Sequence, residues 1–496
     1  MKKKLGLAAL FAAFAALAIP GAASAASISE VSGLVGEKTS ELDMVWVAVA
    51  CVLVFLMQAG FMFLEIGFSR QKNAGTGVAK VLVNFAIVTI AWWVLGYGVA
   101  EGGGNDFFGT SGFFFHFDQT IGQGEEAFNV AGPDAMLMLY GLAFCAVSLA
   151  IVWGTTLERI KFGAYVIYAA VFGAIIYPLI AHAVWGGGLL SDIGGKPVMD
   201  FAGSSVVHLT GAVGALAALL LLGPRKGKYD ASGNPRVIPG HSMPLVGLGV
   251  IILWIGWFGF NGGSTFETAG SFFGEVMLNT QLAAAAGVIG ASIAVWLKSR
   301  TLDVGMAGNG AIAGLVGITA PSGFVEYWAA PLIGIFAGFL VVYAVLAIDK
   351  VLDDPVGALS AHGLAGIWGT LAVGIFASPR LIVEGAGPGI WYGIFGDESL
   401  GNALGQLGVQ ACAVVFTFVV VFAISIATFA AIRATIGLRV SEEEEEAGLD
   451  ISSHGMYGYP ENFIPEPEYS TGLPSTMGPV TTPAPAVSPM STTESA

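Results

Sequence analysis

The chain has 496 residues, of which 55% are hydrophobic and only 11% are charged, and 71 are glycine. Water-soluble domains of this total length would carry far more charged side chains, so the composition excludes that class and indicates a membrane protein. Abundant glycine fits this class, because small residues let helices approach closely inside a bilayer. The net charge of −15 comes mostly from the acidic segment after Gly437. It therefore predicts neither a basic partner nor a nucleic-acid partner.

Residues 1–26 have the pattern of a secretory signal peptide. Lysines at the start are followed by an apolar stretch, a Pro-Gly pair and small residues that end at Ala25 and Ala26. This order is typical of a leader with its cleavage site. We expect cleavage near Ala25 or Ala26, and an uncleaved first helix is the alternative.

The mature chain, residues 27–440, contains eleven apolar segments that are candidates to cross a hydrocarbon layer of about 30 Å. They lie at about 44–67, 78–100, 134–156, 162–184, 200–223, 243–264, 277–298, 305–322, 324–348, 355–378 and 404–437. The 305–322 segment is the weakest, because it is short and rich in glycine. We expect an all-α integral membrane protein with eleven transmembrane helices, the last of them unusually long, followed by an acidic tail at 441–496.

An odd number of spans places the two chain ends on opposite sides of the membrane, and the basic residues indicate which side is which. One side holds Arg70, Lys72, Lys80, Arg159, Lys161, Arg225, Lys226, Lys228, Arg236, Lys298, Arg300, Lys350, Arg433 and Arg439. The other side holds Lys38, Lys196 and Arg380. The asymmetry predicts a multi-pass protein of the cytoplasmic membrane, with the mature N-terminus outside and the C-terminus in the cytoplasm.

The fifth and tenth spans repeat one pattern. Asp200 precedes His208 by eight residues, Asp354 precedes His362 by the same interval, and glycines follow each histidine. Two halves of five spans each start on opposite sides, so they would be inverted repeats, and transporters of that kind place their substrate site near the midplane. Each histidine lies about 12 Å inside its span. Ionisable groups at that depth usually face a pathway, although a lone buried histidine is more often a packing residue.

Several segments resemble the Amt/MEP/Rh ammonium transporter family in order and spacing, over about residues 42–459. They are GFSRQKN, LERIKF, AHAVWGGGLL, DFAGSSVVH, GWFGFNGGS, NGAIAGLVGITA, DDPVGALSAHG and LRVSEEEEEAGLDISSHG. The resemblance implies an ammonium transporter that assembles in the lipid membrane as a homotrimer, with a separate pore in each subunit. It also implies that ammonium, with methylammonium as its analogue, is the substrate.

By the same resemblance, an outer cation site consists of Phe144, Trp185 and Ser264, with Asp200 buried beside it. Phe144 and Phe260 would form a stacked gate below that site, and His208 and His362 would line the pore. This chemistry is sensible, because an aromatic face attracts a cation and a serine oxygen accepts an N–H bond, which potassium does not offer. Without the resemblance, the same aromatic residues would be read as helix packing or as an interfacial belt.

The cost of desolvation constrains the mechanism. Moving a bare ammonium-sized ion into a low-dielectric medium costs on the order of 20 kcal/mol in the ideal limit, far more than cation–π contacts return. We therefore expect the ion to lose its proton near Phe144 and Asp200 and to cross as ammonia past His208 and His362, which burial would keep neutral. The histidines could relay the proton, so transport would carry charge. Neutral gas conduction remains the alternative.

The chain departs from the family pattern in the outer lining, where Tyr140 keeps the aromatic residue of an aromatic–glutamine pair but Gly141 replaces the glutamine. Gln58 and Glu65 share one face of the first span. Glu65 lies near the cytoplasmic end of that span, so we expect it to form a salt bridge or cap with Arg70. A role at the mouth of the pore is the alternative.

The remaining motifs argue against enzymes and cofactors. The cysteines, Cys51, Cys145 and Cys412, all lie in apolar segments and suggest neither a disulfide nor a metal site. Phosphate-binding glycine loops, zinc-protease motifs and serine-nucleophile motifs are missing from the sequence. We expect no enzyme activity, no metal and no cofactor. A membrane cytochrome with His208 and His362 as haem ligands is a weaker alternative.

The tail resembles the family's cytoplasmic segment, which folds under the subunits and can respond to PII-type regulatory proteins. Beyond about residue 462 the chain is rich in Pro, Ser and Thr, and we expect it to be disordered. An ammonium sensor with little flux is the main alternative function, because some family members carry signalling domains. The Pro-, Ser- and Thr-rich end predicts no such domain here.

Overall fold

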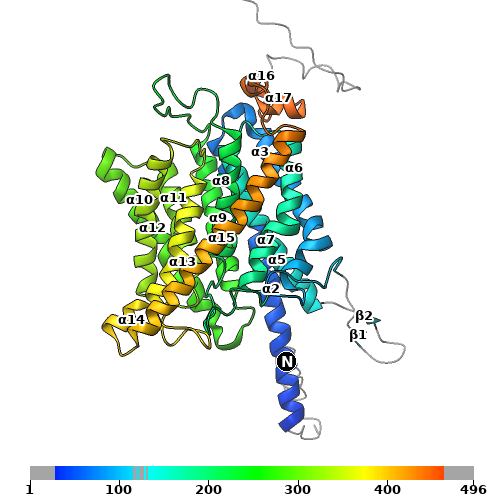
Figure 1. The fold of residues 1–496 in the computed structure, drawn as a ribbon, viewed down its shortest axis with the longest axis vertical. Helices are drawn as coiled ribbons and strands as arrows, with labels where there is room; N and C mark the ends of the chain where they lie inside the picture. Colours follow the sequence, from blue (N-terminus) through cyan, green and yellow to red (C-terminus); the bar gives the residue numbers. More distant parts are fainter. Residues whose placement is uncertain (1–27, 116–119, 122–127, 130–131, 463–496) are drawn as a thin grey trace, which may run out of the picture.

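The computed structural model describes residues 28–115, 120–121, 128–129 and 132–462. The predicted signal peptide, residues 1–26, and the predicted disordered end after about residue 462 lie outside the described residues. The described chain is mostly helical and forms one bundle of long helices (Figure 1). Its strands, β1 (Thr120–Ile121) and β2 (Phe128–Asn129), form a short antiparallel pair. The predicted all-α membrane architecture is confirmed.

The helices follow the predicted spans in order. The first half of the chain contains α2 (Ile28–Phe68), η1 (Gln71–Asn73), α3 (Ala74–Ala91), η2 (Trp92–Gly96), α4 (Tyr97–Glu101), α5 (Gly132–Thr155), α6 (Phe162–Val171), η4 (Phe172–Ile176), α7 (Tyr177–Val184), η5 (Ser204–Leu209) and α8 (Thr210–Leu222). The second half contains α9 (Met243–Gly263), η6 (Ala269–Ser271), α10 (Phe272–Ser299), α11 (Val304–Thr319), α12 (Ala329–Ile348), η7 (Leu359–Leu364), α13 (Ala365–Phe376), α14 (Ile390–Phe395) and α15 (Leu400–Thr435). The tail adds α16 (Glu442–Ala447), α17 (Leu449–His454) and η8 (Pro460–Asn462).

Ten helices in the described part of the chain are long and apolar enough to cross a membrane. The remaining predicted span, at 305–322, corresponds to α11, which has 16 residues. At 1.5 Å per residue it covers about 24 Å, less than the thickness of the hydrocarbon layer. Length alone therefore gives ten spans, and the predicted number of eleven depends on whether α11 is counted.

The two ends of the bundle differ in what they carry. α16 and α17 lie at one end, called the tail end here, while β1, β2 and the first turns of α2 lie at the opposite end (Figure 1). α15 runs obliquely along the outside of the bundle (Figure 1). The start of α2 and the tail helices therefore lie at opposite ends, as an odd number of crossings requires.

Glycine makes the closest helix contacts possible. A Cβ atom added at Gly287 in α10 would lie 2.3 Å from the carbonyl oxygen of Gly310 in α11. One added at Gly334 in α12 would lie 2.1 Å from the carbonyl oxygen of Ala283 in α10. Only glycine permits these backbone approaches, which explains why so apolar a chain contains so much of it.

A buried ionic cluster joins the loops at the tail end. Arg225 binds both carboxylate oxygens of Asp353 at 2.9 Å, and Arg159 donates to the Asp353 backbone oxygen. Arg70 binds Glu158 with its side chain and its backbone N–H. The predicted pairing of Glu65 with Arg70 is therefore wrong, because α2 ends at Phe68 and the chain then turns toward Glu158.

The acidic tail is attached to this end by specific contacts. The Asp450 carboxylate accepts hydrogen bonds from the backbone of Gly75 and Thr76 at the start of α3. Lys226 forms ion pairs with Glu442 and Glu446. Carboxylates are favourable at a helix N-terminus, so the tail caps α3 as well as covering the loops.

The Asp353 carboxylate yields a stability prediction. Burial alone would raise its pKa, but the hydrogen bond from Arg225 and the charges of Arg159 and Arg225 outweigh burial and lower the pKa to about 2. A carboxyl with a lowered pKa stabilises the folded state above its unfolded pKa, and this contribution is lost as the pH falls toward 2. Asp353→Asn should lower the free energy of unfolding near pH 7 by about 3–5 kcal/mol, because it leaves buried arginine charges unpaired.

Unfolding in detergent micelles, measured as a function of pH, checks this prediction. The difference between wild type and Asp353→Asn should shrink below about pH 4, because the carboxyl of the unfolded chain is protonated there while that of the folded chain keeps its charge until about pH 2. Lys226→Gln is the matched control, because the ion pairs that it removes, with Glu442 and Glu446, are exposed to solvent and contribute little to stability. Equal effects of the two substitutions at neutral pH would contradict the account.

Candidate functional site

A cavity of about 620 Å³ opens at the end of the bundle opposite the tail. Its walls are mostly aromatic, and Glu101, Tyr140 and Ser264 supply polar side chains. Phe144 and Trp185, both predicted for the outer cation site, line the same cavity, with their ring centroids 6.2 Å apart. The structure thus brings together Phe144 from α5, Trp185 from the C-terminal end of α7 and Ser264 from the C-terminal end of α9.

The hydroxyl of Ser264 is oriented by its neighbours. Ser264 Oγ donates to the backbone oxygen of Phe260 at 2.8 Å, and Tyr140 Oη lies 3.2 Å from Ser264 Oγ. Because the Ser264 proton is used toward Phe260, the lone pairs of its oxygen remain available as acceptors. The sequence did not indicate the contact between Tyr140 and Ser264, because the two residues lie far apart in the chain.

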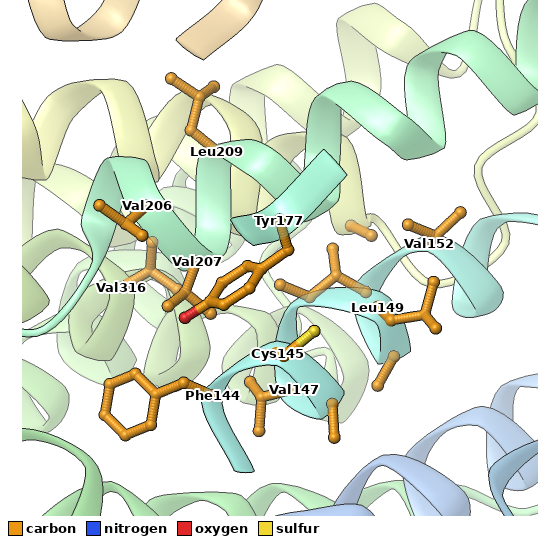
Figure 2. Packing of buried hydrophobic residues seen from close by; sticks show 14 of the residues in the cluster. Phe144, Cys145, Val147, Leu149, Val152, Tyr177, Val206, Val207, Leu209 and Val316 are labelled. Carbon is orange, nitrogen blue, oxygen red and sulfur yellow. The ribbon is translucent and has the colours of Figure 1, made fainter. Parts of the chain in front are cut away.

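Below the cavity, the rings of Phe144 and Phe260 are stacked with centroids 3.9 Å apart and an angle of 10° between their planes. Both side chains are buried. Phe144 belongs to a packed apolar cluster with Val207 and Val316, and Figure 2 shows its ring on their side of α5, away from Leu149. The two phenylalanines predicted as a gate therefore close the floor of the cavity with apolar surface.

Asp200 is held in a tight turn and does not line the cavity. Its two carboxylate oxygens accept hydrogen bonds from the backbone N–H groups of residues 203–206 and from the Ser205 hydroxyl. Its backbone oxygen accepts a bond of 2.8 Å from the Trp185 indole. The carboxylate thus caps the start of η5, and the residue as a whole positions Trp185.

The two predicted pore histidines meet behind the phenylalanine pair. His208 Nδ1 lies 3.2 Å from His362 Nδ1, and both side chains are buried. The ring of His208 lies 5.5 Å from that of Phe260 and 5.1 Å from that of Trp257, between centroids. Trp257 was not among the predicted site residues, although GWFGFNGGS contains it. Its indole N–H donates to Thr319, which fixes the surface against which His208 stacks.

Both histidines lie on π-helical turns, η5 and η7. Such turns are rare and frequently occur at functional sites. Asp354 accepts from the backbone N–H groups of Gly357 and Leu359, as Asp200 does at the first repeat. The repeated spacing in the sequence therefore corresponds to a repeated local structure, in which an aspartate caps a π-helical turn that carries a histidine.

The contact between the histidines restricts their protonation. Two nitrogens at 3.2 Å form a hydrogen bond only when one carries a proton and the other does not. The same separation is shorter than the roughly 4 Å that two metal–imidazole bonds of about 2 Å each would span. This geometry favours a shared proton over the haem-ligand alternative. Among the described residues, no group of three His, Cys, Asp or Glu side chains could hold a metal ion.

Trp92 explains the departure from the family pattern at Gly141. A Cβ atom added at Gly141 would lie 2.8 Å from Cζ2 of the Trp92 indole. The Trp92 ring lines the cavity and is anchored by a hydrogen bond from its N–H to the Met138 backbone oxygen. The indole thus occupies space beside α5 that a larger side chain at 141 would need.

A second and much smaller cavity, about 20 Å³, lies on the tail side of His362. Phe61, Glu65, Asn309 and His362 are among its walls. With the outer cavity it brackets the histidine pair, so a cavity is present on each side of the apolar floor made by Phe144 and Phe260.

Comparison with known proteins shows the family to which the chain belongs. The family model described as Ammonium Transporter Family matches residues 45–459. Ammonium transporter Amt2 of Archaeoglobus fulgidus is 42% identical over 438 residues, covering 85% of this chain and 89% of the relative. An ammonium transporter of Bacillus subtilis is 32% identical over 423 residues, covering 85% of this chain and 99% of the relative.

Solved structures of the same kind are also similar. A protein titled Sensor Amt Protein has a TM-score of 0.76 and 32% identity, with 84% of this chain and 100% of that chain covered. Mep2 of Candida albicans has a TM-score of 0.70 and 29% identity, with 81% and 87% covered. The family match spans the helices that form both cavities and the histidine pair. The chain is therefore a multi-pass membrane protein that belongs to the ammonium transporter family.

Proposed function

We propose that the chain binds ammonium in the outer cavity, removes one proton, and conducts ammonia past His208 and His362 while the proton follows through the histidine pair. The 3.2 Å contact between the two Nδ1 atoms, directly behind the stacked phenylalanines, is the observation that carries this proposal. Family membership supports ammonium transport, and the steps below are what the described residues can contribute to it.

Recognition would take place among Phe144, Trp185 and Ser264. An ammonium ion against the aromatic faces gains about 0.5–2 kcal/mol by cation–π attraction, with the larger values where water is excluded. Ser264 Oγ accepts one N–H bond, because its own proton is already donated to Phe260. Potassium has no hydrogen to donate and gains only the cation–π part.

Deprotonation would take place before the ion passes the floor of the cavity. An intact ion would have to enter the apolar region beyond Phe144 and Phe260, at an idealised cost on the order of 20 kcal/mol. The Asp200 carboxylate is an unsuitable acceptor, because both of its oxygens already accept hydrogen bonds. Among the described residues, His208 Nε2 is buried and has no hydrogen-bond partner, so we assign the proton-accepting role to that atom.

The histidine pair would then move the proton without moving the ion. A proton that binds His208 Nε2 allows the proton on His208 Nδ1 to pass to His362 Nδ1, and His362 Nε2 releases one on the far side. Ammonia itself is uncharged and passes the apolar floor at far lower cost. One charge would cross per ammonia, so membrane potential would contribute about 2.3 kcal/mol per 100 mV.

Orientation and assembly belong to the same proposal. The basic residues of the tail end, such as Arg70, Arg159 and Arg225, support a cytoplasmic location for that end, with the outer cavity facing outside. The exposed apolar side chains along α15, among them Val415 and Val419, support contact with lipid or with other subunits of a homotrimer. The tail helices α16 and α17 offer a surface to a PII-type regulatory protein.

A sensor with little flux is the second candidate, supported by the similarity to the solved protein titled Sensor Amt Protein. A sensor would need the outer cavity, which this chain has. It would have no need of a second cavity beyond the histidine pair. Sustained uptake of labelled methylammonium into liposomes favours transport, whereas saturable binding without uptake favours sensing.

Replacement of the pore histidines tests the relay. In liposomes on a solid-supported membrane, an ammonium pulse should produce a current in the wild type, and a potassium pulse should produce none. His208→Ala should lower the ammonium current at least tenfold, because it removes both the unpartnered Nε2 and the bond to His362. His241→Gln is the matched control, since His241 contacts Ser69 and Tyr459 at the tail end and should leave the current unchanged. Full current in His208→Ala would contradict the relay.

Replacement of Ser264 tests recognition. Ser264→Ala removes one acceptor for a charged donor, a loss of about 1.5 kcal/mol. The ammonium concentration that gives half-maximal current should therefore rise roughly tenfold. Ser191→Ala, which lies in a loop at the same end and outside the cavity lining, should not change it. An unchanged half-saturating concentration in Ser264→Ala would remove Ser264 from the site.

A further inference from the structure

Glu65 is a buried acid that the proposed relay does not use. Glu65 is 1% exposed, and neither of its carboxylate oxygens has a hydrogen-bond partner among the described residues. Lys80 in the neighbouring α3 is also 1% exposed, and its Nζ likewise has no hydrogen-bond partner among the described residues. The two groups act on each other electrostatically, yet they form no ion pair within 4 Å among those residues.

The Glu65 carboxylate lies at the small cavity behind His362. Glu65 and His362 line this cavity together, and an added Cβ at Gly154, another of its walls, would lie 3.7 Å from Glu65 Oε1. The volume of about 20 Å³ has room for a single small molecule, because a water needs roughly 10–15 Å³ by the same measure. His362 uses Nδ1 toward His208, so Nε2 is the nitrogen left to face other partners.

The neighbouring basic residues that the structure describes do not form a structural salt bridge with Glu65. Arg70, the partner expected from the sequence, binds Glu158 instead. Arg159 donates to the backbone oxygens of Gly223 and Asp353. Lys80 is the remaining cation that acts on Glu65. The Tyr165 hydroxyl donates a hydrogen bond to the backbone oxygen of Lys80, which leaves the Lys80 ammonium group unengaged by this contact.

An acid in this position is costly to keep. A buried pair of opposite charges stabilises a protein only when good geometry and further hydrogen bonds offset desolvation. Glu65 and Lys80 lack both, and ionisable groups inside a membrane protein are usually functional. The arrangement instead offers a basic oxygen beside a space for one small molecule, with a nearby ammonium to balance its charge.

We propose that Glu65 is the proton acceptor at the tail end of the pore. The proton that leaves Nε2 of His362 binds a Glu65 oxygen, directly or through the one molecule that the cavity holds. Ammonia arriving in the cavity takes this proton, so an O–H bond breaks, an N–H bond forms, ammonium leaves and Glu65 returns to the carboxylate. The Lys80 ammonium stabilises that carboxylate between cycles. The inference rests on the proposed function, since it assumes that a proton passes through the histidines.

Ammonium-evoked current on a solid-supported membrane tests the inference, with current normalised to the amount of monodisperse protein. Glu65→Gln keeps the volume and removes the acid, so the current should fall at least tenfold. Glu65→Asp shortens the side chain and keeps the acid, so it should retain more current than Glu65→Gln. A packing role predicts the reverse order, because glutamine is the closer match in shape.

The double variant Glu65→Gln with Lys80→Met guards against misfolding, since it leaves no buried ammonium without a counter-charge. This folded variant should still lack the current. Gln58→Met, on the same face of α2 but outside the small cavity, is the matched control and should keep it. Wild-type current in the double variant or in Glu65→Gln would overturn the inference. A wild type that produces no ammonium current would instead overturn the proposed function.

Discussion

The hydrogen bond between His208 and His362 is the interaction on which the account depends. Two imidazoles in an apolar core can share a proton only if their nitrogens are held at hydrogen-bond distance, and the observed 3.2 Å meets that condition. Nothing about the rings alone would keep them there. Each ring sits on a π-helical turn, and an aspartate shortly before each turn accepts hydrogen bonds from backbone N–H groups at its start.

The two aspartates therefore have an architectural role with functional consequences. Unpaired backbone N–H groups at the start of a helix are costly inside a membrane, and a carboxylate supplies acceptors for several of them at once. Asp200 satisfies four backbone donors and also presents its backbone oxygen to Trp185. The outer cavity and the histidine pair are thus linked through one residue that contacts neither the cavity nor the pore.

Much of the fold could be predicted from the sequence, because apolar length and the placement of basic residues reflect simple costs in a bilayer. The spacing of Asp200 and His208, repeated at Asp354 and His362, predicted that the two histidines occupy equivalent positions in the two halves of the chain. The structure brings these histidines into contact. The π-helical form of those turns could not be predicted, since it depends on how the surrounding helices pack. α11 was predicted as a span but is shorter than its neighbours.

Side-chain partners were harder to predict than spans. Glu65 and Arg70 are close in sequence, but Arg70 follows the end of α2 and binds Glu158, whose backbone has the unusual φ of 70°. Trp92 lies far in sequence from Gly141, and only the folded chain shows that the indole fills the space beside it. Such pairings depend on tertiary geometry that neither hydropathy nor residue spacing contains.

The central claim is that the two histidines are neutral and share one proton along the Nδ1–Nδ1 contact. Solid-state nitrogen NMR of the protein in lipid, with labelled histidine and assignment through single replacements of His208 and His362, tests it directly. The account predicts one ring protonated at Nδ1, the other bare at Nδ1, and a coupling across the hydrogen bond between them. Two rings that both carry their proton on Nε2, with no coupling between the Nδ1 atoms, would contradict it.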